Sequence, residues 1–327
     1  MKTNNRRRFL QLAGATLATP FIARGAAATD SPWPNQPIRV LVGFTAGSTT
    51  DIVGRIPLER VSAQIGQPIV IENRGGAGGS IAAAAALQAE PNGHTLLVHS
   101  SGLAATPVIL PNAPFDAGTA FSGIAMFGSV PNILVVSSKS GIRTLADLIE
   151  KSKKTNMTFA SAGIGSASHW GAERLRIACG IEATHVPFRG GPEGLTEVMT
   201  GRVDFMSIGG ASGLALIRDG SLTPLVVSTR VRSVMLPEVP TVIEAGYPKA
   251  LYTFWNGLLA PAKTPKAIVE RLHLEVTKAL ATQQVADRLA ATGNEPLPVT
   301  PSEFDAMIKT DIEANLALAK AANIKFN

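Results

Sequence analysis

The segment Ile38–Arg55, with the sequence IRVLVGFTAGSTTDIVGR, most constrains the fold. It passes from an apolar run, Ile38–Phe44, through a turn of small residues, Thr45–Thr50, into a helical pattern that opens at Asp51. Strands buried on both faces have such continuous apolar runs, and a Thr-Asp pair is suited to capping a helix. The segment therefore predicts a strand–loop–helix unit of an α/β sheet.

Similar units follow at once. Pro68–Glu72 has the pattern of a strand, Arg74–Gly79 is a glycine-rich turn and Ser80–Ala89 is an Ala-rich helical stretch; a third strand-like run, His94–His99, is closed by Ser100 and Ser101. In parallel sheets the loops after the strands meet at one edge, where helix N-termini bind anions. We predict that a carboxylate lies between the first two loops.

The first 28 residues have the pattern of an export signal. Paired arginines at Arg6–Arg8 precede a weakly apolar run, and Ala26–Ala28 provides a cleavage motif, as in twin-arginine signals. An N-terminal helix of the folded protein is the alternative. The signal predicts cleavage near Ala28 and a periplasmic location, and the apolar run is too short to span a membrane.

The charge balance excludes two classes of partner. The whole chain carries a formal charge of +6, but five basic residues and no acid lie in the first 28 positions, which leaves about +1. Without a clustered basic face, binding to nucleic acid or to an anionic membrane is not expected. The remaining 299 residues suit two domains, and a single cysteine, Cys179, precludes an internal disulfide.

The middle of the chain predicts a second α/β domain. Phe121–Ser137 holds two apolar runs and is a candidate crossing between domains, and Phe254–Leu259 is a candidate return. We therefore expect an α/β fold of two lobes, residues 29–131 with 254–327 and residues 132–253. The helices predicted after Pro265 are expected to pack on the first domain and not to line a site.

No motif for catalysis or metal binding is evident. The sequence has no nucleophile elbow, no P-loop and no group of metal ligands at suitable spacing, so neither a cofactor nor a metal is expected. An exported hydrolase or isomerase would have to use Ser161 or Ser166 with His169 or His185, and no acid is placed to orient the histidine.

Several motifs, in order, resemble the solute-binding receptors of tripartite tricarboxylate transporters, the Bug or TctC-like family. They are Pro37-Ile38-Arg39, Gly66-Gln67-Pro68, Glu72-Asn73-Arg74 with Gly76–Gly79, Pro91-Asn92-Gly93, Ser161-Ala162-Gly163, His185-Val186-Pro187, Gly201-Arg202-Val203-Asp204 and Trp255–Pro261. The resemblance implies a periplasmic-binding-protein (Venus flytrap) fold with two crossing strands, monomeric by default. It also implies a small carboxylate ligand and a membrane permease as partner; a receptor that signals to a sensor kinase would share the same binding chemistry.

Carried over by position, the resemblance and the loop pattern give a set of ligand-binding candidates. These are Phe44, Thr45, Ala46, Gly47, Ser48, Thr49, Asp51, Gly76, Gly78, Gly79, Ser100, Ser101, Ser161, Gly163, Ser166, His169, Arg189, Gly190, Gly191, Gly209 and Trp255.

Four of these candidates have two interpretations. His169 either donates to a second carboxylate or serves as a cap or partly exposed histidine, and Arg189 either binds a distal carboxylate or forms an ion pair. Trp255 is either an aromatic wall of the cleft or a buried tryptophan. Asp51 is expected to cap its helix rather than contact ligand.

The sequence departs from the family pattern at two places. Thr45-Ala46-Gly47-Ser48 stands where the family usually has Pro-Pro-Gly-Gly, which adds two hydroxyls. Met206–Gly210 lacks the acidic or amide residue that often follows the Gly-Arg-Val-Asp motif. An acid there would suit an amino group, so its absence favours a dicarboxylate or an aromatic acid over an amino acid.

Overall fold

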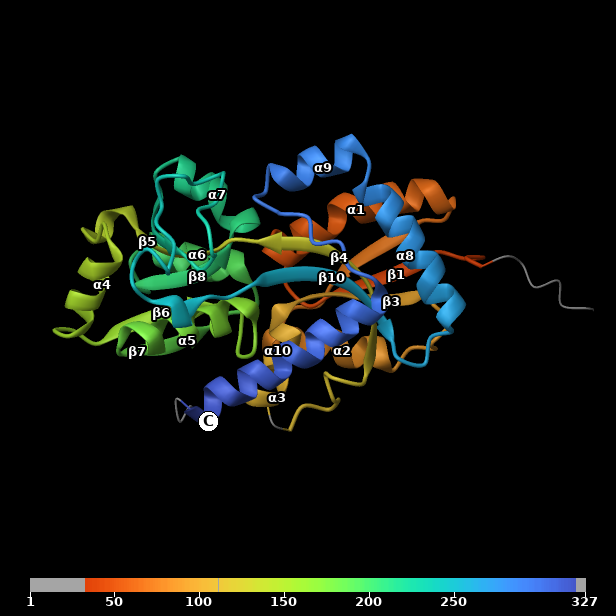
Figure 1. Ribbon diagram of the computed structural model, residues 1–327, viewed down its shortest axis with the longest axis horizontal. Coiled ribbons are helices and arrows are strands. Elements are labelled where there is room, and N and C mark those ends of the chain that lie inside the picture. The colour runs from red at the N-terminus through yellow and green to blue at the C-terminus, as the bar shows by residue number, and fades with distance from the viewer. Residues whose placement is uncertain (1–32, 111, 322–327) are drawn as a thin grey trace, which may run out of the picture. The chain divides into compact units, whose positions relative to one another are not determined.

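Two separate five-stranded sheets organise the computed structural model, which describes residues 33–110 and 112–321 (Figure 1). The predicted export signal lies outside the described residues. We call the part built on each sheet a lobe. The mixed α/β architecture with two lobes agrees with the fold expected from the sequence.

The sheet of the first lobe has the strand order β2-β1-β3-β10-β4. Strand β1 pairs in parallel with β2 and β3, as the repeated strand–loop–helix units predict. Strand β10 runs antiparallel to both β3 and β4. The bounds are Ile38–Val42 for β1, Ile69–Asn73 for β2, Thr95–Ser100 for β3, Phe121–Val130 for β4 and Phe254–Pro261 for β10.

The sheet of the second lobe has the strand order β7-β6-β8-β5-β9. Strand β6 is parallel to β7 and β8, whereas β5 is antiparallel to β8 and β9. The bounds are Asn132–Ser137 for β5, Met157–Ser161 for β6, Ala183–Pro187 for β7, Phe205–Gly209 for β8 and Leu222–Val227 for β9.

Helices cover both sheets. They are α1 Thr49–Ile65, α2 Ser80–Leu87, α3 Thr106–Ile109, α4 Leu145–Ser152, α5 Ala167–Cys179, α6 Gly191–Met199, α7 Gly210–Arg218, α8 Lys266–Leu280, α9 Gln283–Ala290 and α10 Pro301–Ala321, with short 3-10 turns at η1 Ala77–Gly79, η2 Ser101–Ala105, η3 Ser138–Ser140 and η4 Pro248–Ala250.

The chain passes between the sheets twice. Strand β4 leads into β5 through the single residue Pro131, which cannot donate a ladder hydrogen bond. The return runs through residues 228–253 into β10. Figure 1 shows β4 and β10 side by side, leading towards the second sheet, in agreement with their antiparallel pairing. These two connections, called the crossings below, are the covalent links about which the lobes can move.

Each lobe has its own core. In the first, Leu41, Leu97, Trp255 and Phe304 pack in one buried cluster. In the second, clusters that include Phe159 and Met206 cover the sheet. Separate cores let each lobe keep its structure while the angle between the lobes changes.

The C-terminal helix α10 does more than pack on the first lobe. The indole N–H of Trp170, on α5 of the second lobe, donates to Oδ1 of Asn315 on α10 at 2.5 Å. The amide of Asn315 donates in turn to the carbonyl of Ala104 at 3.1 Å. Helix α10 therefore packs on the first lobe and also contacts the second lobe beside the crossings.

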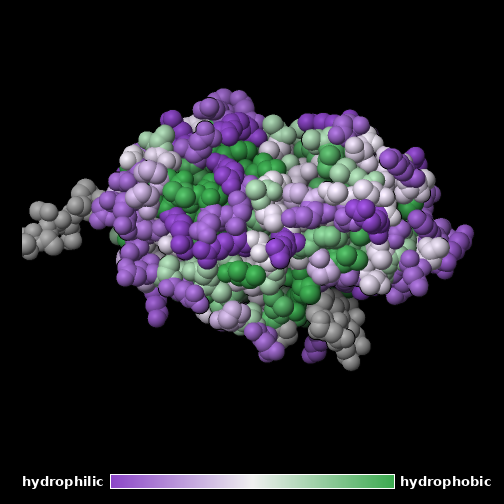
Figure 2. Space-filling model, turned by 180° about the vertical axis from the view of Figure 1, so that it is seen from behind, coloured by the Kyte–Doolittle hydropathy of each residue, from purple (hydrophilic) through white to green (hydrophobic). Residues whose placement is uncertain are grey.

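Seen from behind, the surface is hydrophilic over much of its area, with apolar residues gathered in patches (Figure 2). No helix within residues 33–110 and 112–321 has the length and apolar character needed to cross a membrane.

Candidate ligand-binding cleft

A small cavity lies where the loops after the strands of both lobes meet. Its volume is about 20 Å³, which is room for about one water molecule. Residues of both lobes line it, and they are Phe44, Ser48, Thr49, Thr50, Ser100, Ala162, Ser166, Ala167, Ser168, Gly191, Met206, Ile208, Gly209, Ser212 and Phe254. Most follow the carboxyl ends of parallel strands, as binding residues of open α/β sheets do.

The lining is neutral. Its polar groups are the hydroxyls of serine and threonine, and its apolar walls come from Phe44, Met206, Ile208 and Phe254. Within the described part of the chain, no charged side chain lines this cavity. A ligand anion must therefore be recognised by hydroxyl and backbone N–H donors and by helix N-termini.

Helix N-termini from the second lobe point to the same place. Gly191 and Gly209, at the starts of α6 and α7, line the cavity, and no side chain caps either helix. By contrast, Ser166 caps α5 by accepting from the N–H of His169 at 3.2 Å. Because the first N–H groups of a helix lack intrahelical partners, α6 and α7 supply donors that side chains do not occupy.

Direct hydrogen bonds hold the two lobes together across the cavity. The hydroxyl of Thr49 donates to the carbonyl of Gly209 at 3.1 Å and lies 2.9 Å from the hydroxyl of Ser212. At the rim, Thr45 donates to a carboxylate oxygen of Glu193 at 3.2 Å. These contacts define a closed arrangement of the lobes.

Glycines permit this close approach. Gly78 has φ of +61°, and a Cβ atom there would lie 2.1 Å from the carbonyl oxygen of Ile164 in the other lobe. A Cβ on Gly102 would lie 2.8 Å from the backbone of Gly165 and Ala167. The second loop of the first lobe therefore packs backbone against backbone on the loop that follows β6.

The start of α1 is organised by Asp51, which is 3% exposed. Its carboxylate accepts from the N–H of Gly47 at 3.0 Å, from Nε of Arg55 at 2.8 Å and from the amide of Asn73 at 2.8 Å. Ser48 accepts from the N–H of Asp51 at 3.3 Å. Ser48, and not Asp51 as expected, is therefore the cap of α1; Asp51 stabilises the loop before the helix and does not line the cavity.

The remaining candidates in the first two loops surround the cavity without lining it. Thr45 is half-buried, whereas Ala46 and Gly47 are exposed at the rim. Gly76 and Gly79 have positive φ on either side of Gly78. Ser101 belongs to a different cavity, beside the crossings, where its hydroxyl lies 3.0 Å from that of Tyr252.

His169 faces the interior of the second lobe. Its ring stacks on that of His185 with centroids 3.9 Å apart, and its Nδ1 accepts from the N–H of Gly165 at 3.3 Å. Burial, together with the charges of His185 and Arg176, lowers the pKa of His169 to about 2. The ring is neutral and lies outside the cavity lining, so its interpretation as a donor to a second carboxylate was wrong.

The buried Ser161 pairs with the half-buried His185. Ser161 Oγ lies 2.6 Å from Nε2 of His185 and accepts from the N–H of Gly163 at 3.0 Å. Ser161 has no exposed surface, and burial lowers the pKa of His185 to about 4. Neither residue lines the cavity, and within the described residues no carboxylate is bonded to His185, so the pair belongs to the lobe's internal structure.

Arg189 is exposed on the loop after β7 and has no ion pair with any described residue. It does not line the cavity, whereas Gly191 does. Gly190 is held close to the first lobe, since a Cβ there would clash with the hydroxyl of Thr45. The loop therefore contributes backbone, and not a guanidinium, to the closed cleft.

Trp255 was wrongly considered as a wall of the cleft. It has no exposed surface, packs edge-on against Phe304 and donates its indole N–H to Asp311 at 2.9 Å. The neighbouring residue Phe254 lines the cavity instead, because adjacent residues of a strand face opposite sides of the sheet.

Other lining residues were also missed from the sequence. Ser212 and Ser168 follow loops that were already singled out, so their position one helical turn on was the available signal. Asn256, which does not line the cavity but lies beside Ser100, gave no such signal. It pairs with Ser100 across β3 and β10, and its amide atoms and the Ser100 hydroxyl are buried without hydrogen-bond partners in the described structure.

Two lobes that close an uncharged cavity, with hydroxyl groups and apolar walls, between their loops are typical of a solute-binding protein. A family model described as tripartite tricarboxylate transporter family receptor (TctC) matches residues 53–324. The chain therefore belongs to this receptor family, and the resemblance seen in the sequence is confirmed.

Sequence relatives and similar solved structures agree with this family assignment. The chain is 33% identical to a UPF0065 protein of Pseudomonas sp. strain P51, over 92% of this chain and 90% of that one. It is 30% identical to the protein BugT of Bordetella pertussis, over 94% and 95% of the two chains. Among solved structures, MatC of Rhodopseudomonas palustris with bound malate matches with a TM-score of 0.83 at 30% identity, over 86% of this chain and 98% of that one. R. palustris Rpa4515 with adipate matches with a TM-score of 0.85 at 30% identity, over 89% and 99%.

Proposed function

We propose that this protein is a periplasmic, non-enzymatic receptor that captures a small carboxylic acid in the interlobe cleft and delivers it to a tripartite tricarboxylate-type permease. In this proposal residues 29–131 and 254–327 form one lobe, residues 132–253 form the other, and the receptor acts as a monomer. The observation that carries it is the cavity itself, which residues of both lobes line and which offers only neutral donors.

Neutral donors suit a carboxylate. Hydrogen bonds from N–H and O–H groups to an ionised acceptor are about twice as strong as those between neutral groups. The uncapped starts of α6 and α7 add to this preference. An ammonium group would find no carboxylate in the lining, so a dicarboxylate or an aromatic acid is favoured over an amino acid. The malate and adipate held by two solved family members support the dicarboxylate.

Binding requires the lobes to separate and close again. A cavity of about 20 Å³ cannot hold an organic acid, so ligand must enter an open form. Rotation about the crossings would break the contacts of Thr49 with Gly209 and Ser212. Ligand that bridges both lobes then shifts the population to a closed form, which the permease can distinguish from the open one.

The position of the Ser161–His185 pair favours a receptor role over catalysis. The Ser161–His185 pair is the one serine–histidine contact of hydrolase type that the described residues contain, and it lies outside the cavity. A catalytic nucleophile must reach its substrate, whereas the Ser161 hydroxyl has no exposed surface.

A thermal-shift screen of residues 29–327 tests the ligand class. Malate, succinate, adipate and benzoate are compared with their amides. Because ligand binds the native state, a concentration of 100 times Kd stabilises by about 2.7 kcal/mol. We expect at least one acid, and not its amide, to raise the melting temperature, with compaction in small-angle scattering.

The protein should first be unfolded and refolded so that any co-purified ligand is removed. A melting temperature that none of the acids raises, or that acid and amide raise equally, would contradict the carboxylate assignment. Stabilisation without compaction would contradict closure about the crossings.

A further inference from the structure

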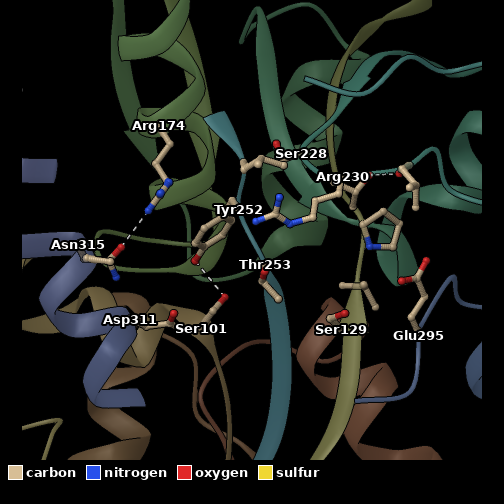
Figure 3. A pocket seen from close by; sticks show the side chains of 16 residues that line it. Ser101, Ser129, Arg174, Ser228, Arg230, Tyr252, Thr253, Glu295, Asp311 and Asn315 are labelled. Atoms are coloured by element: carbon tan, nitrogen blue, oxygen red, sulfur yellow. Dashed lines mark hydrogen bonds between the residues drawn. The ribbon is translucent and has the colours of Figure 1, made fainter. Parts of the chain in front are cut away.

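A second and larger cavity lies beside the crossings (Figure 3). We call it the crossing cavity; its volume is about 360 Å³, within the range of small-molecule sites. Its lining comes from both lobes, from the two crossings and from α5 and α10. The residues that matter below are Ser101, Arg174, Arg230, Tyr252, Glu295 and Asp311.

Arg174 on α5 contributes a half-buried guanidinium. It donates to Oδ1 of Asn315 at 3.2 Å and lies over the ring of Tyr252, 5.8 Å from the centroid. Its Nε is buried and has no hydrogen-bond partner. Burial lowers the pKa of Arg174, with Tyr252 and Asp311 opposing that shift. A guanidinium stays charged in proteins, yet no described carboxylate lies within 4.0 Å of this one.

Arg230 contributes a second guanidinium from the segment after β9. Figure 3 shows its side chain extending into the cavity. It too lacks an ion pair with any described residue. Arginines close by in the sequence differ: Arg176 pairs with Glu173 at 2.9 Å, and Arg232 pairs with Glu244 at 3.0 Å. Both arginines that face the cavity therefore lack a described carboxylate partner within 4.0 Å.

Two acidic residues in the lining, Asp311 and Glu295, limit how much negative charge a ligand in the cavity can carry. Asp311 accepts from the indole of Trp255 at 2.9 Å, and burial raises its pKa. Glu295 is exposed at the other end of the lining. Repulsion from these carboxylates disfavours a polyanion. A ligand with a single carboxylate between the two arginines is attracted by both guanidiniums and is repelled less by Asp311 and Glu295 than a polyanion would be.

The rest of the lining suits a short apolar body. Val130, Leu251 and Ala314 supply apolar surface, and the Ser101 and Tyr252 hydroxyls, 3.0 Å apart, supply a polar pair. We propose that the crossing cavity is a second binding site, for a small monocarboxylate whose carboxylate lies between the guanidiniums of Arg174 and Arg230.

This site is separate from the interlobe cleft. Ser100 and Phe254 line the cleft, whereas their neighbours Ser101 and Thr253 line the crossing cavity. Because its walls belong to both lobes, occupancy depends on the angle between them. Bound monocarboxylate is thus coupled by linkage to opening and closing of the cleft.

The indole N–H signals of two tryptophans in nitrogen-15 NMR spectra report on the occupancy of this site. Trp170 donates to Asn315 and Trp255 donates to Asp311, and both acceptors line the crossing cavity. Butyrate is titrated into three nitrogen-15-labelled proteins, each spanning residues 29–327: the parent, Arg230→Gln and the control Arg218→Gln. Arg218 is a suitable control because it is an exposed arginine on α7. Butyramide is titrated in parallel, and tryptophan-to-phenylalanine variants assign the signals.

We expect butyrate, and not butyramide, to shift both indole signals saturably in the parent and in Arg218→Gln. Arg230→Gln should weaken butyrate binding by about tenfold or more, because it removes a charge-assisted hydrogen bond. Equal responses in Arg230→Gln and Arg218→Gln, or no response to 20 mM butyrate, would overturn the proposal without bearing on the cleft.

Discussion

The hydroxyl of Thr49, in the first turn of α1, lies 2.9 Å from the hydroxyl of Ser212 on α7. The two residues are 163 positions apart and belong to different lobes. Thr49 also donates to the carbonyl of Gly209 at 3.1 Å. The first turn of one lobe's leading helix is therefore bonded to the start of a helix in the other, and this contact exists only while the cleft is closed.

Replacing Thr49 by valine should favour the open form. Valine has the shape of threonine but cannot make these hydrogen bonds, each worth about 1 kcal/mol. We expect a larger radius of gyration without ligand and carboxylate affinity that is lower by about five- to thirtyfold. Small-angle scattering and calorimetry measure the two effects.

Thr196→Val is the matched control, because the Thr196 hydroxyl bonds only to Pro192 within its own helix. The role of Thr49 would be refuted by equal affinities of the Thr49 and Thr196 variants.

Replacing Gly78 by alanine should prevent full closure. The new Cβ would lie 2.1 Å from the carbonyl oxygen of Ile164, and the residue has φ of +61°. The lobes can relieve the clash by staying apart, so we expect ligand affinity to fall at least tenfold while each lobe stays folded. Calorimetry and circular dichroism report these two properties.

Gly66→Ala separates backbone strain from the clash. Gly66 has φ of +66° at the end of α1, and nothing lies within 4 Å of its added Cβ. Its replacement should cost about 1 kcal/mol of stability and leave affinity unchanged. Loss of affinity in both variants would mean that strain, and not interlobe contact, is responsible.

Stability should fall as the pH is lowered. Burial lowers the pKa of His99 and His185 to about 4, and that of His169 to about 2. Unfolded histidines titrate near 6.5, so below that pH the unfolded chain binds more protons than the folded one. From about pH 6.5 towards pH 4, each buried histidine should remove up to about 1.4 kcal/mol per pH unit.

Urea unfolding at a series of pH values measures this dependence. His185→Gln removes one titrating group, so its stability should fall less steeply with decreasing pH than that of the parent. If the free energy of unfolding fell equally steeply with pH in the parent and in His185→Gln, then His185 would not contribute to the pH dependence of stability.

Phe254 and Trp255 should have opposite phenotypes. Phe254→Ala removes a wall of the cleft, so carboxylate affinity or selectivity should change. Trp255→Phe loses the bond to Asp311 in the core of the first lobe, and it should cost about 1–3 kcal/mol of stability with cleft selectivity intact. A thermal-shift panel on both variants checks this; altered selectivity in Trp255→Phe alone would reverse the assignment.

Much of the architecture was predictable because local patterns encode it. The apolar run before Thr45 and the turn of small residues after it predicted β1 and α1, although the helix begins at Thr49 with Ser48 as its cap and not at Asp51. The break at Pro131 predicted the first crossing. Family motifs then predicted the two-lobed receptor, since spacing between turns survives divergence better than the identity of any one side chain.

Which side chains meet in the cleft was not encoded locally. Phe254 and Trp255 are adjacent and both aromatic, and only the register of β10 against β3 and β4 decides which one faces the ligand. His169, in the first turn of α5, and His185, in β7, lie next to loops that the sequence assigned to the cleft, yet their rings stack on each other inside the second lobe.

The sequence by itself determined the strand–loop–helix units, the first crossing and the family, because turns and apolar runs act over a few residues. Tertiary structure alone decided that Thr49 meets Ser212, and that Arg174 and Arg230 share a cavity. Those pairs are joined through sheets whose twist and strand order set the distances, and such long-range geometry leaves no mark in neighbouring residues.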